Sequence, residues 1–297
     1  MIIGVIPNTT KAGIFDVVNR LLLNLSKKKI DFLLSESLLK YSGSLKLKVD
    51  KSKFLEHGLL ASKSDVVVSI GGDGTMLNTA YEARNSGSPV VGLNFGKLGF
   101  LAEVDVDNVT GLIDNIKDGN YSIEKRMALE SFALPSNKRL YAINDIVIDK
   151  GGWPKMIELT VKVDNEYVAT FAADGIIVAT PTGSTGYSLS TGGPIISPQA
   201  DVFVLSPISP HTLTMRPLVL DSRQKVSIEV KSMHTHVQVN CDGQRVYNFE
   251  PPFIIEILKS KKPLSLVHVP GNNYFRILRE KLYWGLDLRN NNNSKKE

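Results

Sequence analysis

The sequence predicts an α/β N-terminal domain with a parallel sheet, followed by a mostly-β C-terminal domain. Up to about residue 118, apolar strand-like runs alternate with amphipathic helical patterns, which is the order that builds a parallel sheet. From Tyr121 onward the helical periodicity fades, and short apolar runs separated by turn residues replace it. Such a change of architecture along one chain indicates two domains, joined near residues 118–122.

In the first part, the spacing of apolar residues places the strands and helices. Residues 14–29, for example, bring Phe15, Val18, Leu22 and Leu25 to one face of a helix. The strand-like runs are residues 2–7, 30–34, 65–70 and 89–93, and the helical patterns are residues 14–29, 52–61, 75–81 and 106–117.

A glycine-rich turn follows the most apolar of these strands. Residues 65–70 are short and β-branched, as in a strand that is buried on both faces, and the turn Gly-Gly-Asp-Gly at 71–74 comes next. Thr75 is expected to cap the helix after it, so free N–H groups and the helix dipole face the turn and suit an anion. Asp73 would repel phosphate there unless a cation or a reacting hydroxyl intervenes. The motif alone predicts either a reaction site or a tight turn with a capping Asp.

The strand at 89–93 also ends in a glycine-punctuated loop, residues 94–101. In open α/β sheets, the carboxyl edge of the strands is where ligands bind. This loop and the turn at 71–74 are therefore expected on one side of the first domain.

The second part consists of apolar runs that read as strands, with Asp164-Asn165 as a hairpin signal. The runs are residues 140–149, 156–163, 167–171, 175–179, 202–205, 225–230, 236–240 and 253–258, and a helical pattern follows at 274–288. We expect an α/β domain at 1–119, a β-rich domain at 120–270, a C-terminal segment at 271–289 that packs on the first domain, and a disordered tail at 290–297.

The composition is that of a soluble globular protein, with 42% hydrophobic and 22% charged residues among 297. The net charge is +5 and the cations are scattered, so no basic stripe indicates a nucleic-acid partner. The single cysteine, Cys241, excludes an intramolecular disulfide and a cysteine-rich metal site. The N-terminus lacks the pattern of a signal peptide, and no apolar run reaches membrane-spanning length. We therefore expect a cytoplasmic protein.

A second polar motif follows the apolar strand at 175–179. The segment from Thr180 to Ser188 is rich in hydroxyls and glycines, which can hydrogen-bond phosphate and ribose oxygens, and Tyr187 adds a ring face. Asn144-Asp145 precedes another apolar run and offers an amide for a base edge and a carboxylate for a diol, although Asn-Asp also forms ordinary turns.

Taken in order, these motifs resemble the NAD kinase family, in the superfamily of diacylglycerol kinases and phosphofructokinases. The resemblance covers nearly the whole chain except the tail. It rests on Gly71-Gly72-Asp73-Gly74, Gly92-Leu93-Asn94, Leu98-Gly99-Phe100-Leu101, Asn144-Asp145, Asp174-Gly175, Thr180 through Ser188, Gly192-Gly193-Pro194, Pro210-His211-Thr212-Leu213 with Arg216-Pro217, and Asp242-Gly243-Gln244.

The resemblance implies a kinase that uses ATP, or another phosphoryl donor, and a divalent metal cation to phosphorylate the 2′-hydroxyl of the adenosine ribose of NAD. Asp73 would be the carboxylate at the reacting hydroxyl, and Gly71, Gly72 and Gly74 are expected to hold nucleotide phosphates. The implied NAD site comprises Asp73, Gly74, Asn144, Asp145, Lys155, Ala172, Asp174, Thr185, Gly186, Tyr187, Ser188, Leu189, Ser190 and Gln244. Mg²⁺ is the expected metal, with its position left open, and a homo-oligomer, dimer or tetramer, is expected.

Three places depart from the family pattern. The segment Thr214-Met215-Arg216-Pro217 differs from the family in the residues before Arg-Pro, so it is not assigned to the site. Asp145 stands where the family usually has Glu, so its reach is one methylene shorter, and Gly186 replaces the common Ala.

Two alternatives share part of this pattern. A lipid kinase of the same superfamily has the same glycine turn, and a non-catalytic dinucleotide-binding sensor could keep the same pocket. A sensor, however, gains nothing from a carboxylate at Asp73 that faces phosphates.

Overall fold

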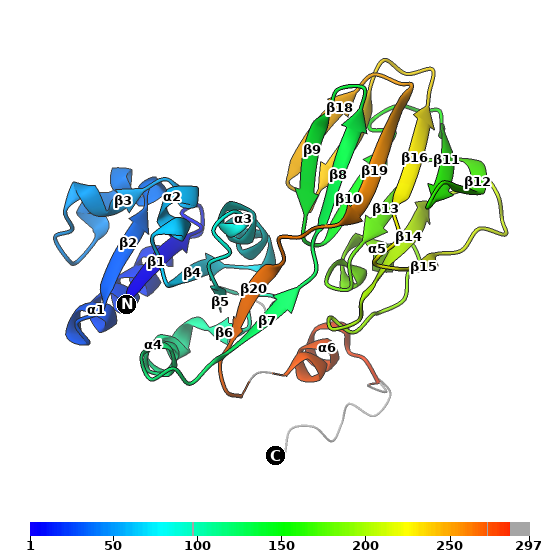
Figure 1. The fold of residues 1–297 in the computed structure, drawn as a ribbon. Helices are drawn as coiled ribbons and strands as arrows, with labels where there is room; N and C mark the ends of the chain where they lie inside the picture. The colour runs from blue at the N-terminus through cyan, green and yellow to red at the C-terminus, as the bar shows by residue number, and fades with distance from the viewer. Residues whose placement is uncertain (97, 272, 286–297) are drawn as a thin grey trace. The chain divides into compact units, whose positions relative to one another are not determined.

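The computed structural model describes residues 1–96, 98–271 and 273–285. By its internal contacts the chain divides into two compact units (Figure 1). Unit 1 comprises residues 1–124 together with the chain from Leu266 onward, and unit 2 comprises residues 125–265.

Unit 1 is built on a mostly parallel sheet, which confirms the predicted α/β class of the N-terminal part. Strand β1 pairs in parallel with β2 and β4, and β4 pairs in parallel with β5. The sheet has the order β3-β2-β1-β4-β5-β20-β7, and β6 pairs with β5. Its strands are β1 (Ile2–Pro7), β2 (Asp31–Ser35), β3 (Phe54–Leu55), β4 (Val66–Gly71), β5 (Val90–Asn94), β6 (Val104–Asp105), β7 (Ser122–Arg126) and β20 (Leu264–His268).

Amphipathic helices bury their apolar faces in the core of this unit. The apolar sides of α1 and α4, including Leu21 and Ile113, join strand residues such as Val68 in one buried cluster. The helices are α1 (Ile14–Lys27), α2 (His57–Ser62), α3 (Asp73–Ala83), α4 (Val109–Lys117) and α6 (Tyr274–Leu282), with 3₁₀ turns at Glu36–Ser44, Lys51–Lys53 and Val106–Asn108.

Three predicted helices of unit 1 differ from the observed ones. The pattern at 52–61 is a 3₁₀ turn, a short strand and then α2, because Glu56 caps α2 by accepting the N–H groups of Gly58 and Leu59. The pattern at 106–117 begins as a 3₁₀ turn, and α4 starts only at Val109.

Helix α3 starts at Asp73 with Gly72 as its N-cap, so the prediction that Thr75 caps it was wrong. A Cβ at Gly71 would lie 2.2 Å from Oγ1 of Thr75, which shows that this hydroxyl packs back against the end of β4.

Unit 2 is a sandwich of two antiparallel six-stranded sheets, which confirms the predicted mostly-β class. One sheet has the order β15-β14-β13-β10-β17-β18, and the other β12-β11-β16-β19-β8-β9. The strands are β8 (Leu129–Leu134), β9 (Lys138–Ala142), β10 (Asp145–Asp149), β11 (Ile157–Val163), β12 (Glu166–Ala173), β13 (Gly175–Ala179), β14 (Val202–Ile208), β15 (Leu218–Asp221), β16 (Val226–Lys231), β17 (Val237–Cys241), β18 (Arg245–Phe249) and β19 (Phe253–Lys259); a 3₁₀ turn (Gly183–Thr185) and a short helix, α5 (Tyr187–Ser190), follow β13.

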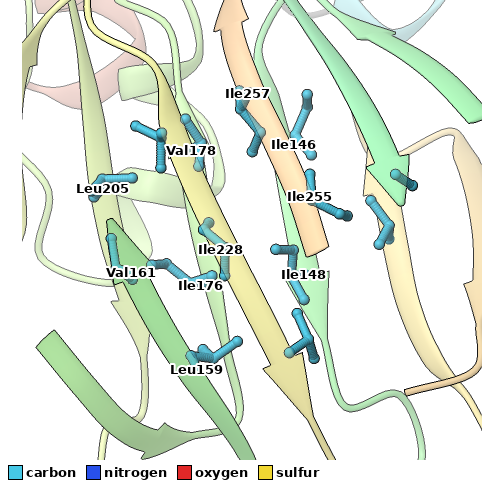
Figure 2. Packing of buried hydrophobic residues seen from close by; sticks show 14 of the residues in the cluster. Ile146, Ile148, Leu159, Val161, Ile176, Val178, Leu205, Ile228, Ile255 and Ile257 are labelled. Carbon is cyan, nitrogen blue, oxygen red and sulfur yellow. The ribbon is translucent and has the colours of Figure 1, made fainter. Parts of the chain in front are cut away.

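The two sheets bury alternate side chains against each other. Figure 2 shows Ile146, Ile176 and Leu205 of one sheet facing Ile228 and Ile255 of the other. Along β11 and β16, buried residues alternate with exposed or half-buried ones, which is the period-2 pattern expected of such strands.

One predicted strand of unit 2 is divided between the sheets. The apolar run 140–149 gives β9 in one sheet and β10 in the other. The chain changes sheet at Ile143 and Asn144, whose N–H groups donate to the buried carboxylate of Asp242 instead of to a neighbouring strand. The predicted hairpin at Asp164-Asn165 is confirmed, with φ of 50° and 72° at these residues.

The C-terminal helix is shorter than predicted. It ends at Leu282, because Tyr283 has a left-handed backbone with φ of 54°. The expected disordered tail, residues 290–297, lies outside the described residues. Within the described part of the chain, no helix combines the length and apolar character needed to cross a bilayer.

A histidine between two carboxylates links strands β20 and β7 to the residue before β6 in unit 1. His268, at the end of β20, places Nδ1 3.0 Å from Oε2 of Glu103 and Nε2 2.6 Å from Oε2 of Glu124. Hydrogen bonds to Glu103 and then to Glu124 raise the pKa of His268 to about 9, against the opposing effect of burial. The imidazolium is therefore the form present at neutral pH.

We expect His268→Ala to lower the free energy of unfolding by up to roughly 3 kcal/mol near pH 6. The folded-state pKa lies above the unfolded value of 6.5, so the stabilisation is fully present below pH 6.5 and is lost as pH rises through about 9. Unfolding midpoints of wild type and variant should converge between pH 6 and 10. His236→Ala, at an exposed histidine, is the control, and a pH-independent difference for His268→Ala would contradict the prediction.

Candidate functional site

In unit 1, the strand, glycine turn and helix start predicted from the sequence are present. Strand β4 is buried along its whole length and ends at Gly71, and α3 begins two residues later without a side-chain cap. The first N–H groups of a helix have no partner within the helix, and the dipole makes this end partly positive. The turn that contains Gly72 and Gly74 therefore has the geometry of an anion site.

The Asp73 carboxylate does not cap its own helix. Its Oδ1 accepts the N–H groups of Leu101 (2.9 Å) and Ala102 (3.1 Å), and its Oδ2 accepts the N–H of Phe100 (2.9 Å) and the ammonium of Lys281 (2.8 Å). The carboxylate thus fixes the loop that follows β5 and binds the C-terminal helix α6.

The position of the Asp73 carboxylate requires a glycine at residue 99 in this loop. A Cβ at Gly99 would lie 2.1 Å from Oδ1 of Asp73, so a side chain there would displace the carboxylate.

The same contacts set the charge of Asp73. Burial disfavours the ionised form, but the hydrogen bond and charge of Lys281 and the N–H groups of Leu101 and Phe100 outweigh it, so the pKa of Asp73 lies below its usual value. The carboxylate is ionised at neutral pH and is a weak base. It suits a reaction in which a proton is accepted only late in bond formation.

A lysine that no sequence motif indicated also reaches the turn. Nζ of Lys11 donates to the backbone oxygen of Phe95 at 2.6 Å. It lies close to two glycines: a Cβ added to Gly72 would be 4.0 Å from this atom, and one added to Gly96 would be 3.8 Å away. Lys11 follows β1, which pairs in parallel with β4, so both strands end at the same edge of the sheet. It supplies a positive charge beside the anion site.

In unit 2, several predicted residues line one pocket of about 380 Å³, and most of the side chains around it carry a polar group. Asn144, Asp145, Gly186 and Tyr187 belong to the predicted site. Further lining residues, which sequence reasoning did not assign to the site, are Val147, Asp149, Gly151, Gln238, Asn240, Asp242 and Gly243.

Strand pairing brings the two polar motifs of unit 2 together. Asp145 of β10 is opposite Ala179 of β13 in an antiparallel pair. The N–H of Thr180 donates to the backbone oxygen of Asn144 at 2.8 Å. Gly183 lies so close that a Cβ there would be 2.1 Å from the same oxygen. The hydroxyl-rich loop therefore folds directly onto Asn144.

Two buried carboxylates control the charge of this pocket. Asp242 accepts the N–H groups of Ile143, Asn144 and Asp145 and pairs with Arg245 at 2.6 Å. Burial, and then the charge of Asp242, raise the pKa of Asp145 to about 7. Burial also raises the pKa of Asp242, but the N–H of Asn144 and the guanidinium of Arg245 oppose that rise. With a pKa of about 7, Asp145 is partly protonated at neutral pH.

The pocket also presents acceptors that have no partner. The amide oxygens of Asn144 and Asn240 are buried, and neither has a hydrogen-bond partner among the described residues. Both residues line the pocket, so a ligand with N–H or O–H donors would satisfy them.

The other predicted residues of unit 2 do not line this pocket. They are Lys155, Ala172, Asp174, Thr185, Ser188, Leu189, Ser190 and Gln244. Two of them have clear structural partners: the Ser188 hydroxyl is buried 2.8 Å from that of Ser206, and Asp174 pairs with Lys150 at 2.6 Å.

The described residues do not form a metal site of their own. Among residues 1–96, 98–271 and 273–285, no group of three or more His, Cys, Asp and Glu side chains is arranged to hold an ion. The carboxylate of Asp73 is already surrounded by four donors. Protein ligands for Mg²⁺ are often only one or two carboxylates, with phosphates and waters as the rest.

Two family descriptions match the chain: the ATP-NAD kinase N-terminal domain over residues 3–121 and the ATP-NAD kinase C-terminal domain over residues 143–269. Among curated relatives, the NAD kinase of Thermoanaerobacter sp. (strain X514) is 37% identical over 287 residues, covering 94% of this chain and 98% of the relative. The NAD kinase of Chlorobium phaeovibrioides is 36% identical over 287 residues, covering 96% and 99%. That of Heliobacterium modesticaldum is 44% identical over 224 residues, covering 74% and 79%.

Two solved structures are similar in fold. Yeast NADH kinase complexed with NADH has a TM-score of 0.89 at 23% identity, covering 97% of this chain and 89% of that one. An NAD kinase from Archaeoglobus fulgidus in complex with ATP has a TM-score of 0.72 at 26% identity, covering 95% and 99%.

The raised pKa of Asp145 predicts an effect on stability. Since the folded-state pKa of about 7 lies above the ordinary 3.8, ionisation of Asp145 weakens the fold as pH rises from about 4 to 7. Asp145→Asn should therefore raise the free energy of unfolding at pH 8 by roughly 1–4 kcal/mol and change it little at pH 4.

Urea unfolding at the two pH values measures this difference. Asp149→Asn, at the other end of β10, is the matched control and should show no such pH-dependent gain. Equal effects of Asp145→Asn at pH 4 and pH 8 would count against a buried, protonated Asp145.

Proposed function

This chain belongs to the NAD kinase family, and from that premise we propose that it transfers the γ-phosphoryl group of ATP to the 2′-hydroxyl of the adenosine ribose of NAD, which makes NADP. The observation that carries the proposal is the ionised carboxylate of Asp73, held at the start of α3 directly after a glycine turn. Phosphoryl transfer needs chiefly positioning and charge stabilisation from the protein.

The residues of unit 1 provide the phosphate-handling part. Gly71, Gly72 and Gly74 let the phosphates approach the backbone at the positive end of α3, and the ammonium of Lys11 offsets their charge. Asp73 accepts the proton of the attacking hydroxyl as the new P–O bond forms.

The residues of unit 2 provide the dinucleotide-binding part. The free amide oxygens of Asn144 and Asn240 accept from an amino or hydroxyl group of the adenosine. Asp145 accepts from a ribose hydroxyl when it is ionised and donates to a ribose oxygen when it carries its proton. Tyr187 offers an exposed ring, and the remaining residues of the predicted NAD site that belong to unit 2 complete this part: Lys155, Ala172, Asp174, Thr185, Gly186, Ser188, Leu189, Ser190 and Gln244.

The two alternatives are not favoured. This chain matches relatives named NAD kinase over nearly their whole length, and this match argues against a lipid kinase. A charged carboxylate beside an anion site argues against a sensor that only binds. We also propose that the enzyme acts in the cytoplasm.

A direct assay tests the proposal. Purified protein incubated with NAD, ATP and Mg²⁺ should form NADP, and EDTA should abolish the reaction because the metal is expected to accompany the nucleotide phosphates. Polyphosphate in place of ATP and NADH in place of NAD then measure donor and acceptor preference. Folded protein that makes no NADP with any of these donors and with Mg²⁺ or Mn²⁺ would refute the function.

Asp73→Asn should lower kcat by about 10²–10⁴-fold, since the amide cannot take the proton of the hydroxyl. NAD affinity should be kept, because Asn144 and the hydroxyl-rich loop remain. The amide also faces three N–H donors that the carboxylate satisfied, so the melting temperature should fall. Assays below the variant's melting temperature separate the effect on kcat from the effect on stability. Near-normal turnover there would mean that Asp73 only fixes the loop after β5.

We further propose that the chain forms a homo-oligomer, a dimer or tetramer. Strands β12 and β15, at the edges of the two sheets of unit 2, expose Tyr167, Val168, Leu218 and Val219. Apolar side chains on unpaired strand edges favour association with another copy. Light scattering should give a multiple of the chain mass, and Val219→Arg should reduce it. A fully active wild-type monomer at assay concentration would contradict this.

A further inference from the structure

The last turn of the C-terminal helix α6 carries a lysine that contacts the site of unit 1. The side chain of Asn273 caps this helix by accepting the N–H of Phe275 at 2.8 Å. Ile277 and Leu278 are buried, and the ring of Tyr274 lies 6.1 Å from that of Phe100. These contacts hold α6 against the loop after β5.

Lys281 lies in the last turn of α6. Its Nζ donates to Oδ2 of Asp73 at 2.8 Å and lies 4.7 Å from the centroid of the Phe100 ring. The side chains of the pair are only 33% and 27% exposed. Solvent therefore screens this ion pair less than it would a pair on the open surface.

The four donors around Asp73 differ in how easily they can leave. A carboxylate has about four acceptor positions. The backbone N–H groups of Phe100, Leu101 and Ala102 take three of them and cannot leave without refolding the loop. Lys281 takes the fourth, and its ammonium is carried on a flexible stem of four carbons. A hydroxyl that is to donate to Asp73 can therefore displace only Lys281.

We propose that Lys281 is a positioning residue for Asp73: it occupies the fourth acceptor position in the free protein and yields it to the acceptor hydroxyl. This inference rests on the proposed function. In the reaction, the hydroxyl oxygen forms a bond to phosphorus, the bond from phosphorus to the bridging oxygen of ADP breaks, and the hydroxyl proton passes to Asp73. Lys281 exchanges hydrogen bonds only and stays charged.

The charged groups around the turn support this assignment. Among the described residues, Lys11 from the loop after β1 is a second cation beside this turn, with Nζ 4.0 Å from where a Cβ on Gly72 would lie. Lys11 lies beside Gly72 and donates to the backbone oxygen of Phe95, so it does not occupy the carboxylate. The two lysines therefore have separate tasks, and of these two it is Lys281 that contacts Asp73.

Substitution of Lys281 tests the proposal. Lys281→Ala should lower kcat by about 10–100-fold through misplacement of Asp73, without raising the KM for NAD, because a competitor of the hydroxyl has gone. Lys281→Arg should keep most of the turnover. Ethylammonium chloride should restore part of the kcat of Lys281→Ala, whereas the bulkier tetramethylammonium chloride should not. Arg279→Ala removes an exposed cation from the same helix and should leave kcat unchanged.

Full turnover of Lys281→Ala would overturn the proposal. The proposal would also be overturned if kcat and the melting temperature fell together and neither Lys281→Arg nor ethylammonium restored kcat. That outcome would mean that Lys281 only holds α6 in place.

A second measurement separates this inference from the proposed function. If the wild type makes no NADP, the function fails, but the pair can still be tested by melting temperatures of Asp73→Asn, Lys281→Ala and the double variant. If the ion pair stabilises the fold, the shift of the double variant should be smaller than the sum of the single shifts, because each single change already removes the interaction. Additive shifts would show that Lys281 does not act through Asp73 and would overturn the inference.

Discussion

The carboxylate of Asp73 holds together three segments of unit 1 that are distant in the sequence. It begins α3, accepts three N–H groups of the loop after β5, and binds Lys281 of α6. These hydrogen bonds satisfy backbone groups that no strand or helix pairs, which is why the loop can be irregular and still well defined. The geometry of the turn at 71–74 and the charge of Asp73 depend on the same four contacts.

In unit 2, too, a buried carboxylate accepts consecutive backbone N–H groups, but here the pKa of a neighbouring carboxyl rises. Asp242 accepts three consecutive N–H groups, from Ile143 to Asp145, where the chain passes from one sheet to the other. Arg245 supplies the positive charge that Lys281 supplies in unit 1. Because these donors are used by Asp242, its neighbour Asp145 is left with burial and a nearby negative charge, and the pKa of Asp145 rises to about 7. One carboxylate fixes the backbone, and the other remains available in the pocket.

The parts of the site that follow from the sequence are those encoded locally or by the family resemblance. The apolar run before Gly71 and the glycines after it predict β4 and its turn, because strand and turn preferences act over few residues. Asn144 and the loop after Thr180 come together through the pairing of β10 with β13, which the family resemblance implied without giving the register.

Lys11, Lys281 and Asn240 could not be found in this way. Each reaches its position only through the sheet order or the packing of α6, and no local pattern distinguishes such a residue from an ordinary surface side chain. The fold class could thus be predicted from the sequence, whereas the charged groups that shift the pKa values of Asp73 and Asp145 could not.

The contrast between the two carboxylates also bears on the shorter side chain at Asp145. A longer Glu at this position would carry its carboxyl further from the backbone, whereas Asp145 stays 5% exposed and beside Asp242. With a pKa of about 7 it is partly protonated near neutral pH, so its carboxyl can donate a hydrogen bond as well as accept one. Asp73, surrounded by four donors, can only accept. The two acids carry the same functional group, but their different surroundings give them different pKa values and different capacities for hydrogen bonding.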